Sequence, residues 1–135
     1  MAKMNLKIKI LHWLPRILCI VAIIFISLFA ADTFSSDHTF WQKIINFLIH
    51  LIPSFVMLIM LIIAWKRDLF GGIAFILAGL VFIPIVFSMN RNADQSVASG
   101  LFAVAGVALP FVLVGVLFLI SYSQKRTAKT KQELK

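Results

Sequence analysis

No charged residue interrupts the stretch IINFLIHLIPSFVMLIMLIIAW, which runs from Ile44 to Trp65. The hydrocarbon core of a bilayer is roughly 30 Å thick, so a helix rising about 1.5 Å per residue needs about 20 apolar residues to cross it. This stretch is long enough to do so. The segment Lys66-Arg67-Asp68 follows, and a second uncharged stretch begins at Leu69. Two antiparallel membrane helices joined by a tight hairpin are therefore expected.

The same length test predicts one further span on each side of this pair. The first span is the weakest, because only Ile17 to Ala31 is continuously apolar. It must therefore also include Trp13 to Arg16 or Asp32 to Phe34, and we expect the Arg16 guanidinium to extend to the lipid headgroups. A cleaved signal peptide is disfavoured there, since Leu28 or Phe29 would stand where cleavage needs a small residue. The predicted fold is an all-α, transmembrane four-helix antiparallel bundle with spans at about 14–33, 44–65, 69–89 and 98–122.

The composition excludes a soluble domain. The chain has 135 residues, of which 61% are hydrophobic and 13% charged, against about 45–50% and about 25% in typical soluble domains. A domain of this size has too little interior to bury so many apolar side chains. Residues 1–123 are therefore predicted to form one membrane domain, followed by a mobile basic tail at 124–135.

The basic residues predict the orientation of the helices. Eleven of the 13 Lys and Arg residues precede the first span, lie in the hairpin or follow the last span, and only Lys43 and Arg91 lie at the other end. Positive residues stay on the cytoplasmic side, so both termini are expected there. The basic ends are also expected to meet anionic lipid. Nucleic acid is not an expected partner, because the charges flank apolar runs instead of lining one folded face.

Large amphipathic side chains lie near the predicted membrane boundaries, where such residues anchor helices. Arg16, Trp13, Trp65 and Tyr122 are the predicted anchors on the cytoplasmic side, and Trp41 is the predicted anchor on the outer side.

Polar residues recur every fourth position in the second span, at Asn46, His50 and Ser54. This spacing places them on one helix face. Ser27 of the first span lies at a similar depth, so these four residues form a candidate polar pocket for water, a proton or a small solute. Two other interpretations stay open: hydrogen bonds that fix helix packing, and a contact between His50 and a protein partner.

Small residues in the third and fourth spans are typical of closely packed membrane helices. They include Gly72, Gly79, Gly106 and Gly115. The spacing does not decide between packing inside one chain and packing between copies in a homo-oligomer.

The sequence offers little material for catalysis. It has one Cys, three His and five acidic residues, and no acid or nucleophile accompanies His50 in its span. We expect no enzyme, no cofactor and no metal site. We also expect no buried carboxylate of the kind that coupled pumps use. The favoured function is a non-enzymatic accessory or structural component that assembles with itself or a larger membrane protein. The alternative is a minimal transporter or channel that uses the polar stripe.

Several segments resemble a family of short, uncharacterised bacterial integral membrane proteins whose domain has no assigned function. The likeness covers about residues 13–80, and its clearest parts are Pro15-Arg16-Ile17-Leu18, Ile49-His50-Leu51-Ile52-Pro53-Ser54-Phe55 and Ala64-Trp65-Lys66. The resemblance implies four helices in a bacterial cytoplasmic membrane, and it implies nothing catalytic.

Overall fold

The computed structural model describes residues 6–32, 34, 37, 39–92 and 96–135. This part of the chain forms four α-helices and no strand: α1 (Leu6–Asp32), α2 (Phe40–Lys66), α3 (Asp68–Asn92) and α4 (Val97–Glu133). Each helix is long and apolar enough to cross a membrane. The predicted all-α fold with four membrane-length helices is confirmed.

The helices extend beyond the predicted spans. Most of the difference is at the ends of the chain, where α1 begins at Leu6 and α4 continues to Glu133. Residues 124–133 are therefore helical, which the hydropathy pattern did not predict. Backbone hydrogen bonds do not need lipid, and the Ala, Gln, Lys and Arg residues of this segment favour a helix in water as well. Thr33, at the end of the first predicted span, lies outside the described residues.

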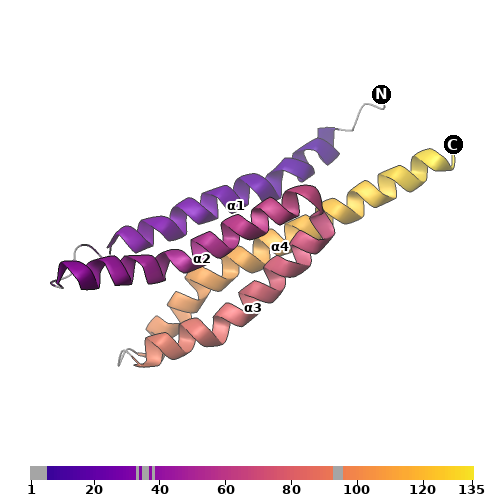
Figure 1. The fold of residues 1–135 in the computed structure, drawn as a ribbon. Helices are drawn as coiled ribbons and strands as arrows, with labels where there is room; N and C mark the ends of the chain where they lie inside the picture. Colours follow the sequence, from indigo (N-terminus) through magenta and orange to yellow (C-terminus); the bar gives the residue numbers. More distant parts are fainter. Residues whose placement is uncertain (1–5, 33, 35–36, 38, 93–95) are drawn as a thin grey trace.

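The four helices alternate in direction around the bundle (Figure 1). α1 packs against α2 and α4, and α3 packs against the same two helices. The start of α1, the α2–α3 hairpin and the end of α4 all lie at one end of the molecule. We call this the hairpin end.

Close contact between α3 and α4 depends on two glycines. A Cβ atom at Gly115 would lie 2.8 Å from the carbonyl oxygen of Gly72, and a Cβ atom at Gly72 would lie 3.0 Å from the carbonyl oxygen of Gly115. Only residues without a side chain allow the two backbones to approach this closely. Gly106 is different, because nothing lies within 4 Å of the position its Cβ would take. Gly72 and Gly115 therefore serve packing inside one chain.

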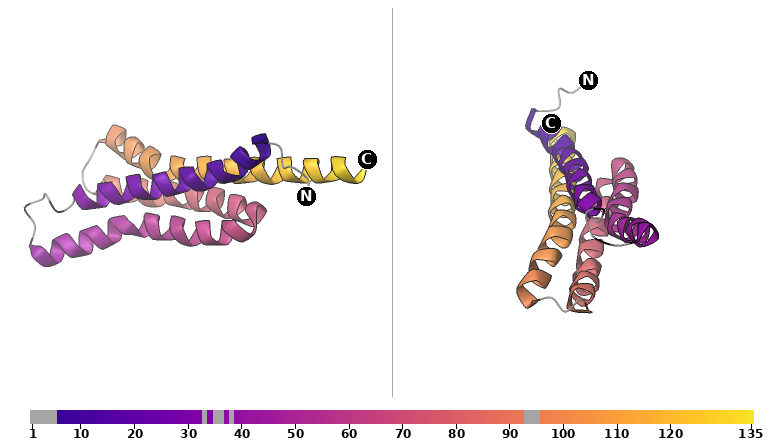
Figure 2. Two further views of the ribbon diagram at one scale, coloured as in Figure 1. Left: turned by 90° about the horizontal axis from the view of Figure 1, so that it is seen from above. Right: turned by 90° about the vertical axis from the view of Figure 1, so that its left-hand side faces the viewer.

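Buried side chains gather in the half of the bundle nearest the hairpin end. The core includes Cys19, Met57, Phe75, Phe111 and Phe118. Towards the opposite end, no described residue of α2 before Ser54 and none of α3 after Gly79 is buried. Figures 1 and 2 show the reason, since the α1–α2 pair and the α3–α4 pair diverge there. Many large apolar side chains face outward along all four helices, as lipid contact requires.

Candidate functional site

Arg16 is buried inside the bundle at the hairpin end. Its side chain is 1% exposed, and its Nη2 donates a hydrogen bond to Asp68 Oδ1 at 2.9 Å. The expectation that Arg16 extends to the headgroups was therefore wrong. The reason is that the hairpin places Asp68 within hydrogen-bond distance of Arg16, so the guanidinium is paired by a carboxylate inside the protein.

Asp68 is the first residue of α3, and its carboxylate joins three helices. Oδ1 accepts from Arg16 on α1, while Oδ2 accepts from Lys125 and lies 3.5 Å from the Ser121 hydroxyl, both on α4. A negative charge is also favourable at the first turn of a helix. We call His12, Arg16, Asp68, Ser121 and Lys125 the end cluster.

The guanidinium of Arg16 also lies between aromatic rings. Its Cζ is 5.5 Å from the ring centres of both Trp65 and Phe118, a distance at which a cation is attracted to a ring face. Its Nε has no hydrogen-bond partner among the described atoms. Arg16 is thus held by one carboxylate and two rings, on α3, α2 and α4.

His12 completes the end cluster from the preceding turn of α1. Its Nδ1 is 3.1 Å from Nη1 of Arg16 and also contacts Nζ of Lys125, and Nη1 donates to the His12 carbonyl. Both neighbouring groups are donors, so Nδ1 acts as the acceptor and the ring proton is assigned to Nε2. His12 therefore takes part as a neutral side chain.

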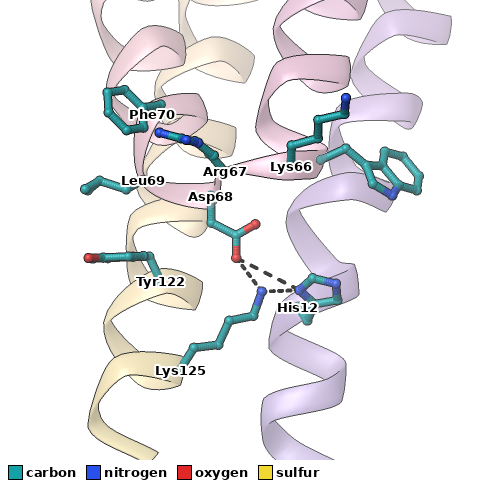
Figure 3. A pocket seen from close by; sticks show the side chains of 9 residues that line it. His12, Lys66, Arg67, Asp68, Leu69, Phe70, Tyr122 and Lys125 are labelled. Atoms are coloured by element: carbon teal, nitrogen blue, oxygen red, sulfur yellow. Dashed lines mark hydrogen bonds and ion pairs between the residues drawn. The ribbon is translucent and has the colours of Figure 1, made fainter. Parts of the chain in front are cut away.

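An open pocket of about 510 Å³ lies beside the end cluster. It is bounded by the hairpin, by α1 and by α4, and Figure 3 shows Asp68, Lys125 and His12 meeting in its centre. Tyr122 and Arg67 lie on one side of this centre and Lys66 on the other. The pocket thus combines cationic and aromatic side chains at the end of the apolar bundle.

The structure brings together two members of the predicted polar pocket and separates the others. Ser27 Oγ donates to Ser54 Oγ at 3.2 Å, which links α1 to α2. Asn46 is half-buried and His50 is exposed, with His50 Nδ1 2.8 Å from the Asn46 carbonyl oxygen. Among the described residues, the hydrogen bonds join Ser27 to Ser54 and His50 to the Asn46 backbone, and none joins the first pair to the second.

The predicted anchors occupy both ends of the bundle. Trp13 and Trp65 form an edge-to-face pair with ring centres 6.2 Å apart at the hairpin end, near the half-buried Tyr122. Trp41 is exposed near the start of α2, at the opposite end. Their depth relative to a membrane stays a prediction.

The sequence analysis did not single out His12, Asp68, Ser121 or Lys125 as site residues. A signal was present, because His12 and Arg16 are four residues apart and so are Ser121 and Lys125. Each pair therefore shares one helix face. Asp68 is also the sole acid near that end of the predicted spans.

The end cluster has the character of a structural contact. Its carboxylate is already shared by Arg16 and Lys125, which leaves it little capacity to act as a base. Among the described residues, no three His, Cys, Asp or Glu side chains are grouped so that they could hold a metal ion. Cys19 lies in the core, away from these groups.

Comparison with known proteins places the chain in a family but assigns it no activity. No curated protein and no solved structure gives a significant match. A family model described as a domain of unknown function (DUF7670) matches residues 4–130. These residues include the whole region of the resemblance found in the sequence, and the chain therefore belongs to this family.

Proposed function

We propose that the chain is a multi-pass protein of the bacterial cytoplasmic membrane, with both termini in the cytoplasm, that acts without catalysis as an accessory or structural component of a larger assembly. Four helices of membrane length support the multi-pass placement. The Lys and Arg residues gathered at the hairpin end support the orientation. The bacterial membrane rests on the family resemblance.

One observation carries the accessory function: His50 faces outward in the middle of an apolar helix. The four-residue spacing puts it on the same face of α2 as Ser54, yet Ser54 is buried and His50 is exposed. A polar side chain at this depth is costly against lipid and normally meets another protein group or water. The Asn46 carbonyl satisfies only Nδ1, so Nε2 is available to a partner helix that packs on this part of α2.

The alternative function, a solute pathway along the polar stripe, gains no support from the interior of one chain. The buried polar side chains among the described residues are Arg16, Ser54, Asp68 and Ser121. Three of them belong to the end cluster, and Ser54 alone lies farther along the bundle. The rest of the described core is apolar, which gives a polar solute no continuous path.

The orientation is tested by cysteine labelling. Cys19 is the single cysteine of the chain, and it is buried, so a Cys19→Ala background can carry one new cysteine at a time. We expect a membrane-impermeant maleimide to label Asp37→Cys in intact cells and Ser123→Cys only after the membrane is opened. Both native residues are exposed. The opposite labelling pattern would contradict the proposed orientation.

The accessory function is tested by oxidative crosslinking in native membranes. In the Cys19→Ala background we expect His50→Cys to form a defined adduct with a second copy or another membrane protein. Ile52→Cys is the control, because Ile52 is also exposed and two residues along a helix point to a different face. Equal crosslinking from both positions, or none from either, would count against a specific contact at His50.

Transport is tested separately with purified protein in vesicles that contain a pH-sensitive dye. We expect wild-type protein and His50→Leu to give the same proton flux as empty vesicles. A wild-type flux that His50→Leu abolishes would replace the accessory function by the transport alternative.

A further inference from the structure

The pocket at the hairpin end carries more positive charge than its own acid can neutralise. Arg16 and Lys125 share the single carboxylate of Asp68, and Lys66 and Arg67 lie exposed on the rim without an ion pair among the described residues. The cluster and its rim therefore hold three more positive charges than negative ones.

No other described acid compensates this excess. Asp32 is the last residue of α1 and Asp37 follows that helix, both at the opposite end of the bundle. Glu133 lies eight residues beyond Lys125, near the end of α4. At about 1.5 Å per residue this is about 12 Å, which exceeds the screening length of about 8 Å at physiological salt. An anion in the pocket would meet an uncompensated positive field.

The surroundings of the pocket indicate what kind of anion fits. Trp65, Phe70 and Tyr122 line it together with the cations, and the apolar lengths of α2 and α3 begin directly beside it. The Arg67 guanidinium stands 5.5 Å from the ring centre of Phe70, which holds it at the edge between charged and apolar surface. Aromatic rings beside basic groups are typical of the headgroup level of a bilayer.

We propose that this pocket binds the phosphate group of an anionic phospholipid from the leaflet at the hairpin end. Lys66 and Arg67 provide the charge on the rim. Arg16 and Lys125 together share one carboxylate, Asp68, and so leave one positive charge in excess at the centre. The acyl chains would extend along the exposed apolar faces of the neighbouring helices. Free phosphate carries the same charged group but gains nothing from those faces, which favours the lipid.

Trp65 lines the pocket and is a natural reporter of lipid binding. In full-length Trp13→Phe/Trp41→Phe protein, Trp65 is the single tryptophan. We expect brominated phosphatidylglycerol, added as a minor fraction to phosphatidylcholine vesicles, to quench its fluorescence more strongly than the same fraction of brominated phosphatidylcholine. Equal quenching by the two lipids would overturn the proposal, and this comparison needs no change to the pocket.

A pair of variants separates the pocket from general attraction by the basic ends. Lys66→Gln/Arg67→Gln removes two charges from the rim, and Lys129→Gln/Lys131→Gln removes two exposed charges from the end of α4. We expect the first variant to lose lipid selectivity by roughly fivefold per charge and the second to keep it. Equal losses in both variants would overturn the pocket as the binding site. Circular dichroism of both variants is the control that checks whether they keep their helices.

The source of the phosphate is decided by competition. At constant ionic strength we expect sodium phosphate to leave the quenching by brominated phosphatidylglycerol unchanged relative to sodium chloride. Relief of quenching by sodium phosphate alone would show that the pocket prefers a free phosphate, which overturns the lipid proposal. None of these outcomes depends on His50 or on the proposed accessory function.

Discussion

At the scale of single residues, we expect the ion pair between Arg16 and Asp68 to contribute most to the stability of the bundle. Removing one partner of a buried ion pair leaves the other charge without compensation. We expect Asp68→Asn to lower the free energy of unfolding in detergent by about 3 kcal/mol. Breaking a buried ion pair usually costs about 3–5 kcal/mol. We expect the low end of that range because Lys125 is 33% exposed and admits water to the end cluster. Titration with a denaturing detergent, followed by circular dichroism, measures the change.

Two comparisons decide whether this loss comes from the unpaired arginine. Asp37→Asn removes an exposed acid at the opposite end and should change stability by no more than about 0.5 kcal/mol. Adding Arg16→Met to Asp68→Asn removes the stranded charge, so it should restore part of the loss. If Asp68→Asn is as mild as Asp37→Asn, the buried pair contributes little to the fold.

The Ser27–Ser54 hydrogen bond should contribute far less than the buried ion pair. Interhelical hydrogen bonds in membrane proteins average about 0.6 kcal/mol, and the 3.2 Å distance between these hydroxyl oxygens is longer than usual for such a bond. We expect a double-mutant cycle with Ser27→Ala and Ser54→Ala to give a coupling energy near that average. A coupling energy near zero would mean that the hydroxyls bond elsewhere.

The residues of the end cluster were hard to predict from the sequence for a physical reason. Asp68 follows Lys66 and Arg67 in a short turn, and an acid in such a place is normally solvated. Its burial depends on Arg16, which is 52 residues away, and on the position along α1 at which the hairpin packs. The Ser27–Ser54 contact was predictable because both residues lie inside uncharged spans, where a hydroxyl must find a partner within the protein.

At the scale of helices, the α3–α4 contact is set by backbone approach at two glycines. We expect Gly115→Ala to destabilise the bundle by about 1–3 kcal/mol, because its Cβ would lie 2.8 Å from the Gly72 carbonyl oxygen and 3.0 Å from the Ile76 nitrogen. Backbone atoms cannot move aside as a side-chain end can, so the helices must separate. Thermal unfolding in detergent measures the loss.

Gly106→Ala is the matched control, since it makes the same substitution in the same helix. No atom lies within 4 Å of the new Cβ, and alanine is a better helix former than glycine by about 1 kcal/mol. We expect unchanged or slightly raised stability. Equal losses from both substitutions would show either that the close backbone contact at Gly115 is not the cause of the loss or that Gly106 packs against another chain.

The helices were predictable in number but not in length. Uncharged runs mark where side chains contact lipid, and four such runs correspond to four helices. The helix ends follow backbone hydrogen bonding instead. In α4 the helix continues through basic residues that hydropathy assigns to water. There the side-chain hydroxyls of Thr127 and Thr130 donate to the carbonyls of Ser123 and Arg126 within the same helix. The divergence of the two helix pairs could not be predicted from the sequence. The four-residue spacing of Asn46, His50 and Ser54 places them on one face of α2 whether or not the helices diverge there.

At the scale of the whole molecule, burial and charge gather at the same end. Most core residues, the end cluster and most basic residues lie near the hairpin, whereas in the opposite half only a few residues, such as Ile26 and Ala30 of α1, are buried. The hairpin end is therefore expected to be the last part of the bundle to unfold. We expect a partner molecule to reach the polar face of α2 in the divergent half, where it needs the least rearrangement.

Truncating the basic tail tests whether the stability of the hairpin end depends on specific contacts or on the charge of the tail. Residues 127–135 extend α4 past the bundle with mostly exposed side chains. A chain ending at Arg126 should keep its stability within about 0.5 kcal/mol. A chain ending at Ser123 also loses Lys125, and with it one of the cations on Asp68. We expect it to be less stable by up to about 1 kcal/mol, because Lys125 is partly exposed and water weakens the pair.

Lys125→Gln in the full-length chain separates the two causes. If the contact with Asp68 accounts for the loss, this single substitution should match the chain that ends at Ser123 in unfolding free energy, although it keeps the other tail charges. If the charge of the tail accounts for it, the loss should instead grow steadily with each basic residue removed, and the chain that ends at Arg126 should already be weakened. Unfolding titrations of the three proteins at low and high salt distinguish these outcomes, because salt screens the exposed tail charges far more than the buried contact.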